Sequence, residues 1–136
     1  MGIYKSAFEL IKENPLFGIG AGSFTEIFFL NTNFWKGHSH NLFFELAISY
    51  GLPATIILVI HITNILYLSS KKIFSDKLLI NSSYFDKAFW SAMFCFLISQ
   101  LADIQYFDGK ISLISWILTA GLKNIILEKS YKDLAS

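Results

Sequence analysis

A long stretch without any charged side chain constrains this chain more than any other feature. Residues 46–70, a run of about 25, contain no Asp, Glu, Lys or Arg. Spanning the hydrocarbon core of a bilayer as a helix takes roughly 20 apolar residues. Gly51 and Pro53 interrupt the run early. We therefore predict a short helix over 41–50 at the membrane interface and a spanning helix over 53–68, with Pro53 in its first turn.

The composition agrees with a membrane protein. Charged residues make up 15% of the 136 residues and hydrophobic ones 54%, whereas soluble domains carry about a quarter charged residues. The net charge of +1 lacks the basic excess of a nucleic-acid binder, so no nucleic-acid partner is expected. Cys95 is the single cysteine, which excludes an internal disulfide.

Two shorter apolar segments, 88–102 and 111–127, predict a second and a third spanning helix. Residues 3–11 instead alternate apolar and charged side chains, which indicates an amphipathic helix too charged to cross a bilayer. The expected fold is all-α and integral to the membrane, with about three transmembrane helices plus an extracytoplasmic amphipathic helix and loop. The expected division is 1–52 outside the membrane, 53–127 within it, and 128–136 as a cytoplasmic tail.

The orientation follows from the lysines, because cytoplasmic loops carry an excess of basic residues. These lysines lie between the first and second spans or close and follow the third, and they are Lys71, Lys72, Lys77, Lys87, Lys123, Lys129 and Lys132. The segment containing His38 and His40 and the turn 103–110 then share the opposite, extracytoplasmic side.

His38, His40 and Asn41 stand just before the first strongly apolar helix. Histidine suits general acid–base work because its ordinary pKa is about 6.5. In an extended segment His38 and His40 would point to opposite sides, and no cluster with metal-ligand spacing accompanies them. The alternative interpretation is that these residues only cap the helix. His61, within the predicted span, either packs neutrally against another helix or has a function.

Two further polar segments are candidates for substrate binding. The loop around Gly20 can present backbone N–H groups to an anion or be a plain turn. Asp103 and Asp108 lie in a polar turn on the predicted side of His40. That turn is either a solvated connection or a source of a carboxylate that orients the histidine.

The order of these motifs resembles the O-antigen ligase and O-antigen polymerase superfamily. The segment Asn-Pro-Leu-Phe-Gly-Ile-Gly-Ala-Gly-Ser-Phe at 14–24 is similar to the family's "P-L-F-G-x-G-x-G-x-F" segment. His-Ser-His-Asn at 38–41 resembles its "H-S-H-N" motif, and 45–53 resembles the "E-x-G-L-x-G" that leads into the next helix. The turn 103–110, followed by Trp116, looks like the late periplasmic turn and last helix of some bacterial members.

The resemblance implies a multi-spanning inner-membrane glycosyltransferase. It would move a glycan from a polyprenyl-diphosphate carrier to a hydroxyl, on lipid A–core or on a growing polysaccharide, beside membrane lipids. His40 matches the family's proposed general base. Substrate binding is expected at His38, Asn41, Gly20, Asp103 and Asp108. No metal or other cofactor is implied.

One departure from the family is the basic residues, because all eleven are lysine and none is arginine. The family's diphosphate-binding arginines lie mainly upstream of the "P-L-F-G" segment, and the resemblance covers only the C-terminal third of a typical member. We therefore expect either part of a larger enzyme, with the missing helices in a separate chain or a longer product, or an inactive remnant. The alternative class is a small non-catalytic membrane protein.

Overall fold

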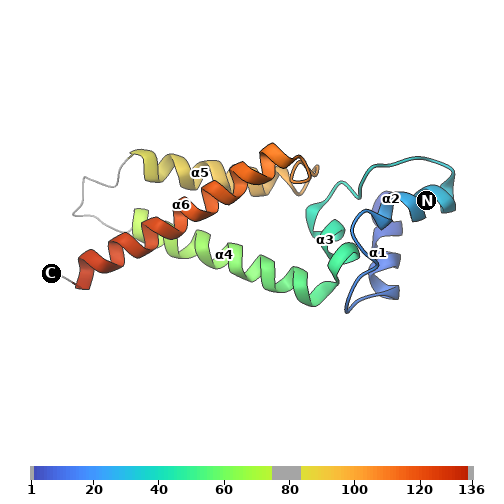
Figure 1. Cartoon of the computed structure of the whole chain (residues 1–136), viewed down its shortest axis with the longest axis horizontal. Helices are drawn as coiled ribbons and strands as arrows, with labels where there is room; N and C mark the ends of the chain where they lie inside the picture. Colours follow the sequence, from blue (N-terminus) through green and yellow to red (C-terminus); the bar gives the residue numbers. More distant parts are fainter. Residues whose placement is uncertain (1, 75–83, 135–136) are drawn as a thin grey trace. The chain divides into compact units, whose positions relative to one another are not determined.

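The structure, a computed structural model, describes residues 2–74 and 84–134, with side chains as far as residue 128. Over these residues every regular element is an α-helix (Figure 1), which confirms the predicted all-α class. The helices are α1 Ile3–Glu13, α2 Ser23–Thr32, α3 Leu42–Tyr50, α4 Leu52–Phe74, α5 Tyr84–Ser99 and α6 Gly109–Leu134.

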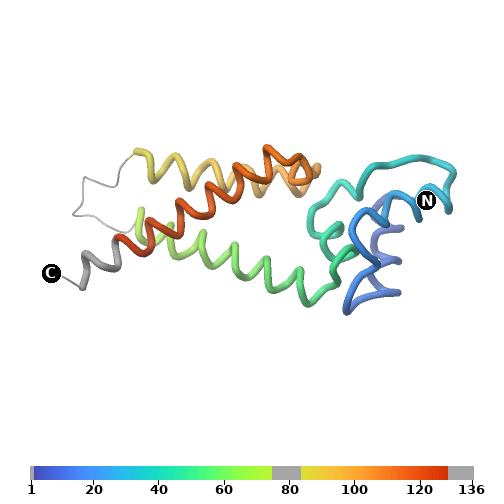
Figure 2. Tube along the Cα trace, viewed as in Figure 1, coloured from blue at the N-terminus to red at the C-terminus, as the bar shows by residue number. Residues whose placement is uncertain are grey.

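The chain divides into two compact units. Unit 1 comprises Met1–Val59 with Ser99–Tyr106, and unit 2 comprises Ile60–Ile98 with Phe107–Ser136. Along the trace in Figure 2, the turn between α5 and α6 thus belongs to unit 1, although both helices belong mainly to unit 2. These two units are defined by contacts within the chain. The predicted boundaries at 52 and 127 concern the surfaces of the membrane instead, and they stay a prediction.

Unit 1 is a small helical core built on α3. Helix α1 contributes its apolar face and keeps its charged residues outside, because the apolar positions recur with the helical period. Both α1 and α2 contact α3. The core consists of Ala7, Leu10 and Ile11 from α1, Phe24 and Phe28 from α2, and Ala47 and Ile48 from α3.

The glycine-rich loop closes unit 1 against the end of α3. The last carbonyl groups of a helix have no partner inside the helix. Here the Ile48 carbonyl accepts the Ile19 N–H at 2.7 Å and the Ser49 carbonyl accepts the Gly20 N–H at 3.1 Å. Gly18 has a φ of +67°, and a Cβ at this position would overlap the Ile48 carbonyl. The loop therefore caps α3 from outside and requires glycine at residue 18.

Unit 2 is held together by side chains from α4, α5 and α6. Ile65, Met93 and Leu122 form its buried core, one from each helix. The Trp90 indole N–H donates to the Leu66 carbonyl at 3.0 Å, which links α5 to α4. The three apolar segments recognised in the sequence therefore pack as one bundle.

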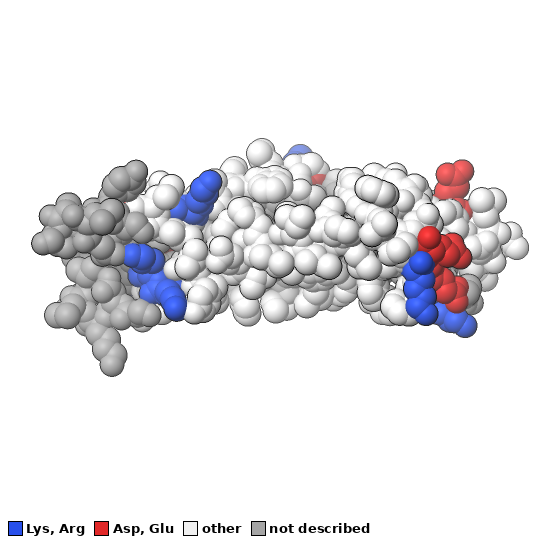
Figure 3. Space-filling view, turned by 90° about the horizontal axis from the view of Figure 1, so that it is seen from below, with Lys and Arg blue, Asp and Glu red and all other residues white. Residues whose placement is uncertain are grey.

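Two helices have the length and apolar character needed to cross a membrane, α4 over Leu52–Phe74 and α6 over Gly109–Glu128. Only 11% and 17% of their most apolar windows are buried, unlike core helices of a soluble protein. Figure 3 shows that most of the visible surface over these helices is neither acidic nor basic. Both helices therefore have the character of membrane spans.

Helix α5 differs from the expectation of three spans. It has 16 residues, a length of about 24 Å at 1.5 Å per residue, against the roughly 30 Å of a bilayer core. The third crossing stays a prediction. So does the orientation, since Lys77 and the side chains of Lys129 and Lys132 lie outside the described residues.

Candidate functional site

Asn41 organises the segment that carries the histidines. It is the N-cap of α3, and its Oδ1 accepts the N–H groups of Phe43 and Phe44 at 3.0 and 3.3 Å. Such a cap satisfies donors that the first turn of a helix leaves free. The predicted capping role of Asn41 is therefore confirmed.

Asn41 also joins α3 to the turn that follows α5. Its Nδ2 donates to the Leu101 carbonyl at 3.1 Å, and the Leu42 N–H donates to the Gln100 carbonyl at 3.0 Å. The two segments lie about 60 residues apart in the sequence and are both part of unit 1. These bonds place the turn containing Asp103 beside the histidine segment.

Gln100 gives that turn its shape. Its side chain is buried, and its Oε1 accepts the N–H groups of Gln105 and Tyr106 at 3.0 and 3.1 Å. The chain between residues 100 and 106 is thereby closed into a loop with Asp103 on its exposed side. The Ile104 N–H donates to Asp103 Oδ1 at 2.9 Å, which fixes the carboxylate.

The two histidines meet at this carboxylate. His40 Nδ1 lies 3.0 Å from Asp103 Oδ1, and His38 Nε2 lies 3.8 Å from the same oxygen. His40 has a φ of +57° rather than an extended conformation, and the two ring centres are 4.5 Å apart. The expectation that the rings point to opposite sides is therefore wrong, because it assumed an extended backbone.

The hydrogen bonds define which ring nitrogens carry protons. The hydrogen bond with His40 lowers the pKa of Asp103 below its usual 3.8, and the Ile104 N–H and the nearby His38 act in the same direction. Asp103 is thus ionised at neutral pH, and an ionised carboxylate only accepts hydrogen bonds. In the neutral form of His40 the proton then lies on Nδ1, and the lone pair of Nε2 can accept a proton.

These three side chains also have the spacing of a metal-ion site. One ligand atom each from His38, His40 and Asp103 lies within 4.8 Å of the others, so the expectation that no such cluster accompanies the histidines is wrong. A ligating histidine normally donates its second ring N–H. His38 Nδ1 instead faces the His40 N–H as an acceptor at 3.3 Å, which puts the His38 proton on Nε2. This arrangement favours a hydrogen-bonded cluster over a metal ion.

Ser39 and Glu45 support the segment from within. Both are buried, and the Ser39 N–H donates to Glu45 Oε2 at 2.9 Å. The Ser39 hydroxyl donates to the Asn41 carbonyl at 3.1 Å. Sequence reasoning from residue types missed Glu45 and Gln100 in these roles. Glu45 could have been found as a carboxylate within an otherwise apolar helix. No feature of the sequence pointed to Gln100.

The remaining candidates lie elsewhere. The N–H of Gly20 is taken by Ser49, so in this conformation it does not face an anion. Asp108 belongs to unit 2 and accepts the N–H groups of Lys110 and Ile111 at the start of α6. His61 is exposed on α4 rather than packed against another described helix. None of the three is part of the cluster of His38, His40 and Asp103, which we call the histidine site.

Comparison with known families agrees with the motifs. Residues 1–59 match the family model described as O-Antigen ligase. This stretch includes the glycine-rich loop, α3 and both histidines, and over it the resemblance to the O-antigen ligase family is confirmed. A search of curated proteins and a search of solved structures each returned no match. The geometry at Asp103 therefore stands on the structure alone.

Proposed function

We propose that this chain contributes the proton-accepting segment of a membrane glycosyltransferase. The enzyme would transfer a glycan from a polyprenyl-diphosphate carrier to a hydroxyl of lipid A–core or of a growing polysaccharide. The observation that carries the proposal is the 3.0 Å contact between His40 Nδ1 and Asp103 Oδ1, within a unit that bears the O-antigen ligase match.

The reaction needs a base at the acceptor. The acceptor oxygen forms a bond to the anomeric carbon of the donor glycan while the bond from that carbon to the diphosphate oxygen breaks. The hydroxyl proton passes to His40 Nε2, and the polyprenyl diphosphate leaves with the bonding electrons. A base with a pKa near the working pH suits this step.

Asp103 would help in two ways. Its carboxylate holds the proton on His40 Nδ1, so that Nε2 is the free acceptor. It also stabilises the imidazolium that forms when Nε2 takes the proton, since opposite charges at this distance favour the charged form. Asp103 would thus be a positioning residue and His40 the catalytic one.

The leaving diphosphate requires positive charge around it. Because the chain has no arginine, lysines or another segment of the enzyme would supply that charge. We place the histidine site on the extracytoplasmic side of a bacterial inner membrane, since the lysines after α4 favour a cytoplasmic position there.

The test is a transfer assay in native membranes. Membranes containing the protein are mixed with a polyprenyl-diphosphate-linked radiolabelled glycan and a hydroxyl acceptor, and labelled product is separated by gel. We expect product from the wild-type protein and none from His40→Ala at equal membrane levels. Equal product from both would contradict the proposal. That result would favour the alternative class, in which the chain is a small membrane protein without catalytic activity.

A further inference from the structure

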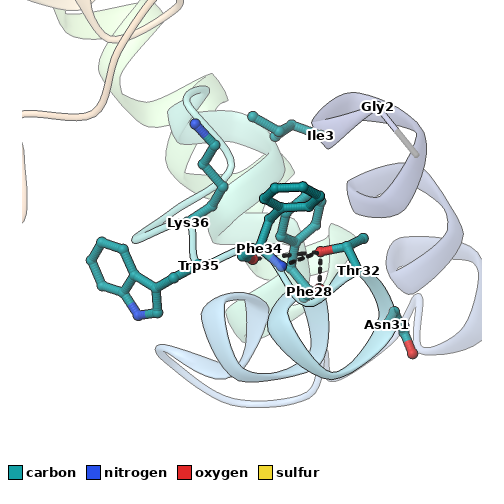
Figure 4. A pocket seen from close by; sticks show the side chains of 8 residues that line it. All are labelled: Gly2, Ile3, Phe28, Asn31, Thr32, Phe34, Trp35 and Lys36. Atoms are coloured by element: carbon teal, nitrogen blue, oxygen red, sulfur yellow. Dashed lines mark hydrogen bonds between the residues drawn. The ribbon is translucent and has the colours of Figure 1, made fainter.

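A second feature of unit 1 is an open pocket at the segment leading to the histidine site. It has a volume of about 770 Å³ and is lined by the start of α1, the end of α2 and the consecutive residues Phe34, Trp35 and Lys36 (Figure 4). In Figure 4, Trp35 and Lys36 lie on one side of the pocket and Asn31 on the other. None of the residues that line this pocket belongs to the histidine site.

Hydrogen bonds hold the pocket wall in place. The Thr32 hydroxyl donates to the Phe28 carbonyl at 2.7 Å and accepts the Phe34 N–H at 3.2 Å. Asn33 ends α2 in the left-handed conformation, with a φ of 58°. The chain therefore turns sharply before Phe34 and returns across the end of α2.

The far end of the wall is also anchored to α2. The Thr25 hydroxyl donates to the Gly37 carbonyl at 2.7 Å. A Cβ added at Gly37 would meet the outer edge of the Trp35 ring at 3.3 Å, so this edge of the indole lies beside Gly37. Trp35 is thus supported from one direction while its side chain stays 71% exposed.

The pocket combines an aromatic surface with hydrogen-bonding groups. Phe34 is as exposed as Trp35, and Asn31 offers both a carboxamide oxygen and an NH₂ group. Among the ion pairs of the described residues, none involves Lys36, so its ammonium is available to a ligand. Binding sites of this kind pair an apolar surface with a few polar groups that fix orientation.

A pyranose ring matches this combination. One face of such a ring presents C–H groups that stack on an indole. Its edge carries hydroxyls that accept hydrogen bonds from an amide or an ammonium group. Trp35 also lies only three residues before His38, so their Cα atoms are at most about 11 Å apart. A di- or trisaccharide spans such a distance.

We propose that this pocket is a glycan subsite, in which Trp35 stacks against a sugar ring and the neighbouring Lys36 binds its hydroxyl or acidic groups. The inference rests on the proposed function, because the sugar would belong to the glycan that reacts at His40. It adds the residues that would hold the saccharide beyond the reacting unit.

The test measures binding without transfer. The full chain is placed in nanodiscs of phosphatidylcholine and phosphatidylglycerol. The probe is the lipid-free oligosaccharide released by mild acid from the host's own surface polysaccharide, and calorimetry gives its dissociation constant. We expect Trp35→Ala to raise that constant about tenfold, since truncating a central aromatic contact typically has an effect of this size.

Matched variants make the result specific. Trp116→Ala removes another half-exposed tryptophan, in unit 2, and should leave the constant unchanged, while Trp35→Phe should recover most of the affinity. Absence of saturable binding to the wild-type chain would overturn the proposal. So would equal effects of Trp35→Ala and Trp116→Ala.

Two further readouts separate the alternatives. If lipids with brominated acyl chains quench Trp35 fluorescence and the oligosaccharide does not relieve the quenching, Trp35 is a membrane anchor and the proposal fails.

His40→Ala should bind the oligosaccharide as the wild type does. If it does so and still transfers glycan normally, the subsite stands while the proposed function falls.

Discussion

His40 and Asp103 are separated by 63 residues in sequence, yet their Nδ1 and Oδ1 atoms lie 3.0 Å apart. Both residues belong to unit 1, and the backbone around each is fixed by its own hydrogen bonds. The pair has the geometry of a histidine oriented by a carboxylate, the arrangement in which the free Nε2 serves as a base.

The first prediction concerns the contribution of Asp103 to transfer. Asp103→Asn keeps the size of the side chain but removes the charge that holds the proton on His40 Nδ1. We expect the rate of glycan transfer to fall on the order of 10²-fold. Asp103→Asn combined with His40→Ala should be no slower than His40→Ala alone, because the two groups act as a unit. A full additional loss in the double variant would show that Asp103 acts independently of His40.

The second prediction concerns the ionisation of Asp103. Its pKa is lowered from the usual 3.8 chiefly by the hydrogen bond with His40. A depressed pKa means that this group stabilises the folded state at pH above 3.8, and that the contribution is lost as the pH falls through the lower folded-state pKa. His40→Ala should therefore raise the titration midpoint of the Asp103 carboxyl.

Carboxyl ¹³C NMR in detergent micelles measures that midpoint directly. Phe43→Ala, a change at an exposed position on α3, serves as the control and should not move it. An identical Asp103 titration in the wild type and in His40→Ala would refute the interaction.

The third prediction concerns the tight backbone contacts between the segment 16–20 and the end of α3. Gly18 and Gly51 both have positive φ, and a Cβ would overlap the Ile48 carbonyl at Gly18 and the Leu16 carbonyl at Gly51. We expect alanine at either position to lower the free energy of unfolding by about 2 kcal/mol or more. Denaturant titration in mild detergent, followed by circular dichroism, measures the loss.

Gly109→Ala is the matched control for this pair. A Cβ at Gly109 meets nothing within 4 Å, and the residue opens α6 without a positive φ. That variant should be as stable as the wild type. If Gly18→Ala and Gly109→Ala unfold at the same denaturant concentration, the tight contact between the loop and α3 is not present.

The fourth prediction separates the two roles of Asn41. Asn41→Asp keeps an oxygen that caps α3, whereas Asn41→Ala removes the cap at a cost of about 1 kcal/mol in stability. Both variants lose the Nδ2 donor to the Leu101 carbonyl. We expect both to perturb the NMR signals of His40 and Asp103, but only Asn41→Ala to lower the free energy of unfolding markedly. Unchanged histidine signals in Asn41→Asp would mean that the bond to Leu101 does not position the site.

The helices were largely predictable because each depends on a local pattern. The apolar run after Glu45 indicated α4, and Asn41 before that run indicated the cap of α3. The end of α5 was not predictable from sequence, since the helix ends at Ser99 although the predicted segment runs to Ala102. There Gln100 takes up backbone N–H groups of the turn, a tertiary arrangement that periodicity does not encode.

The site was only partly predictable for a different reason. Residue types identified His40 and Asp103 singly, but their meeting depends on a positive φ at His40 and on bonds from Asn41 and Leu42 to the turn after α5. None of these follows from spacing along the chain. The assumption of an extended backbone therefore separated two rings that the structure brings together.

The most direct test of the central claim compares two histidine variants in the transfer assay. His40→Ala removes the proposed base, and His61→Ala removes the histidine exposed on α4, outside the histidine site. At equal membrane levels we expect a loss of transfer of about 10²- to 10⁴-fold in His40→Ala and a rate close to that of the wild type in His61→Ala. Normal transfer by His40→Ala would contradict the claim that His40 accepts the proton.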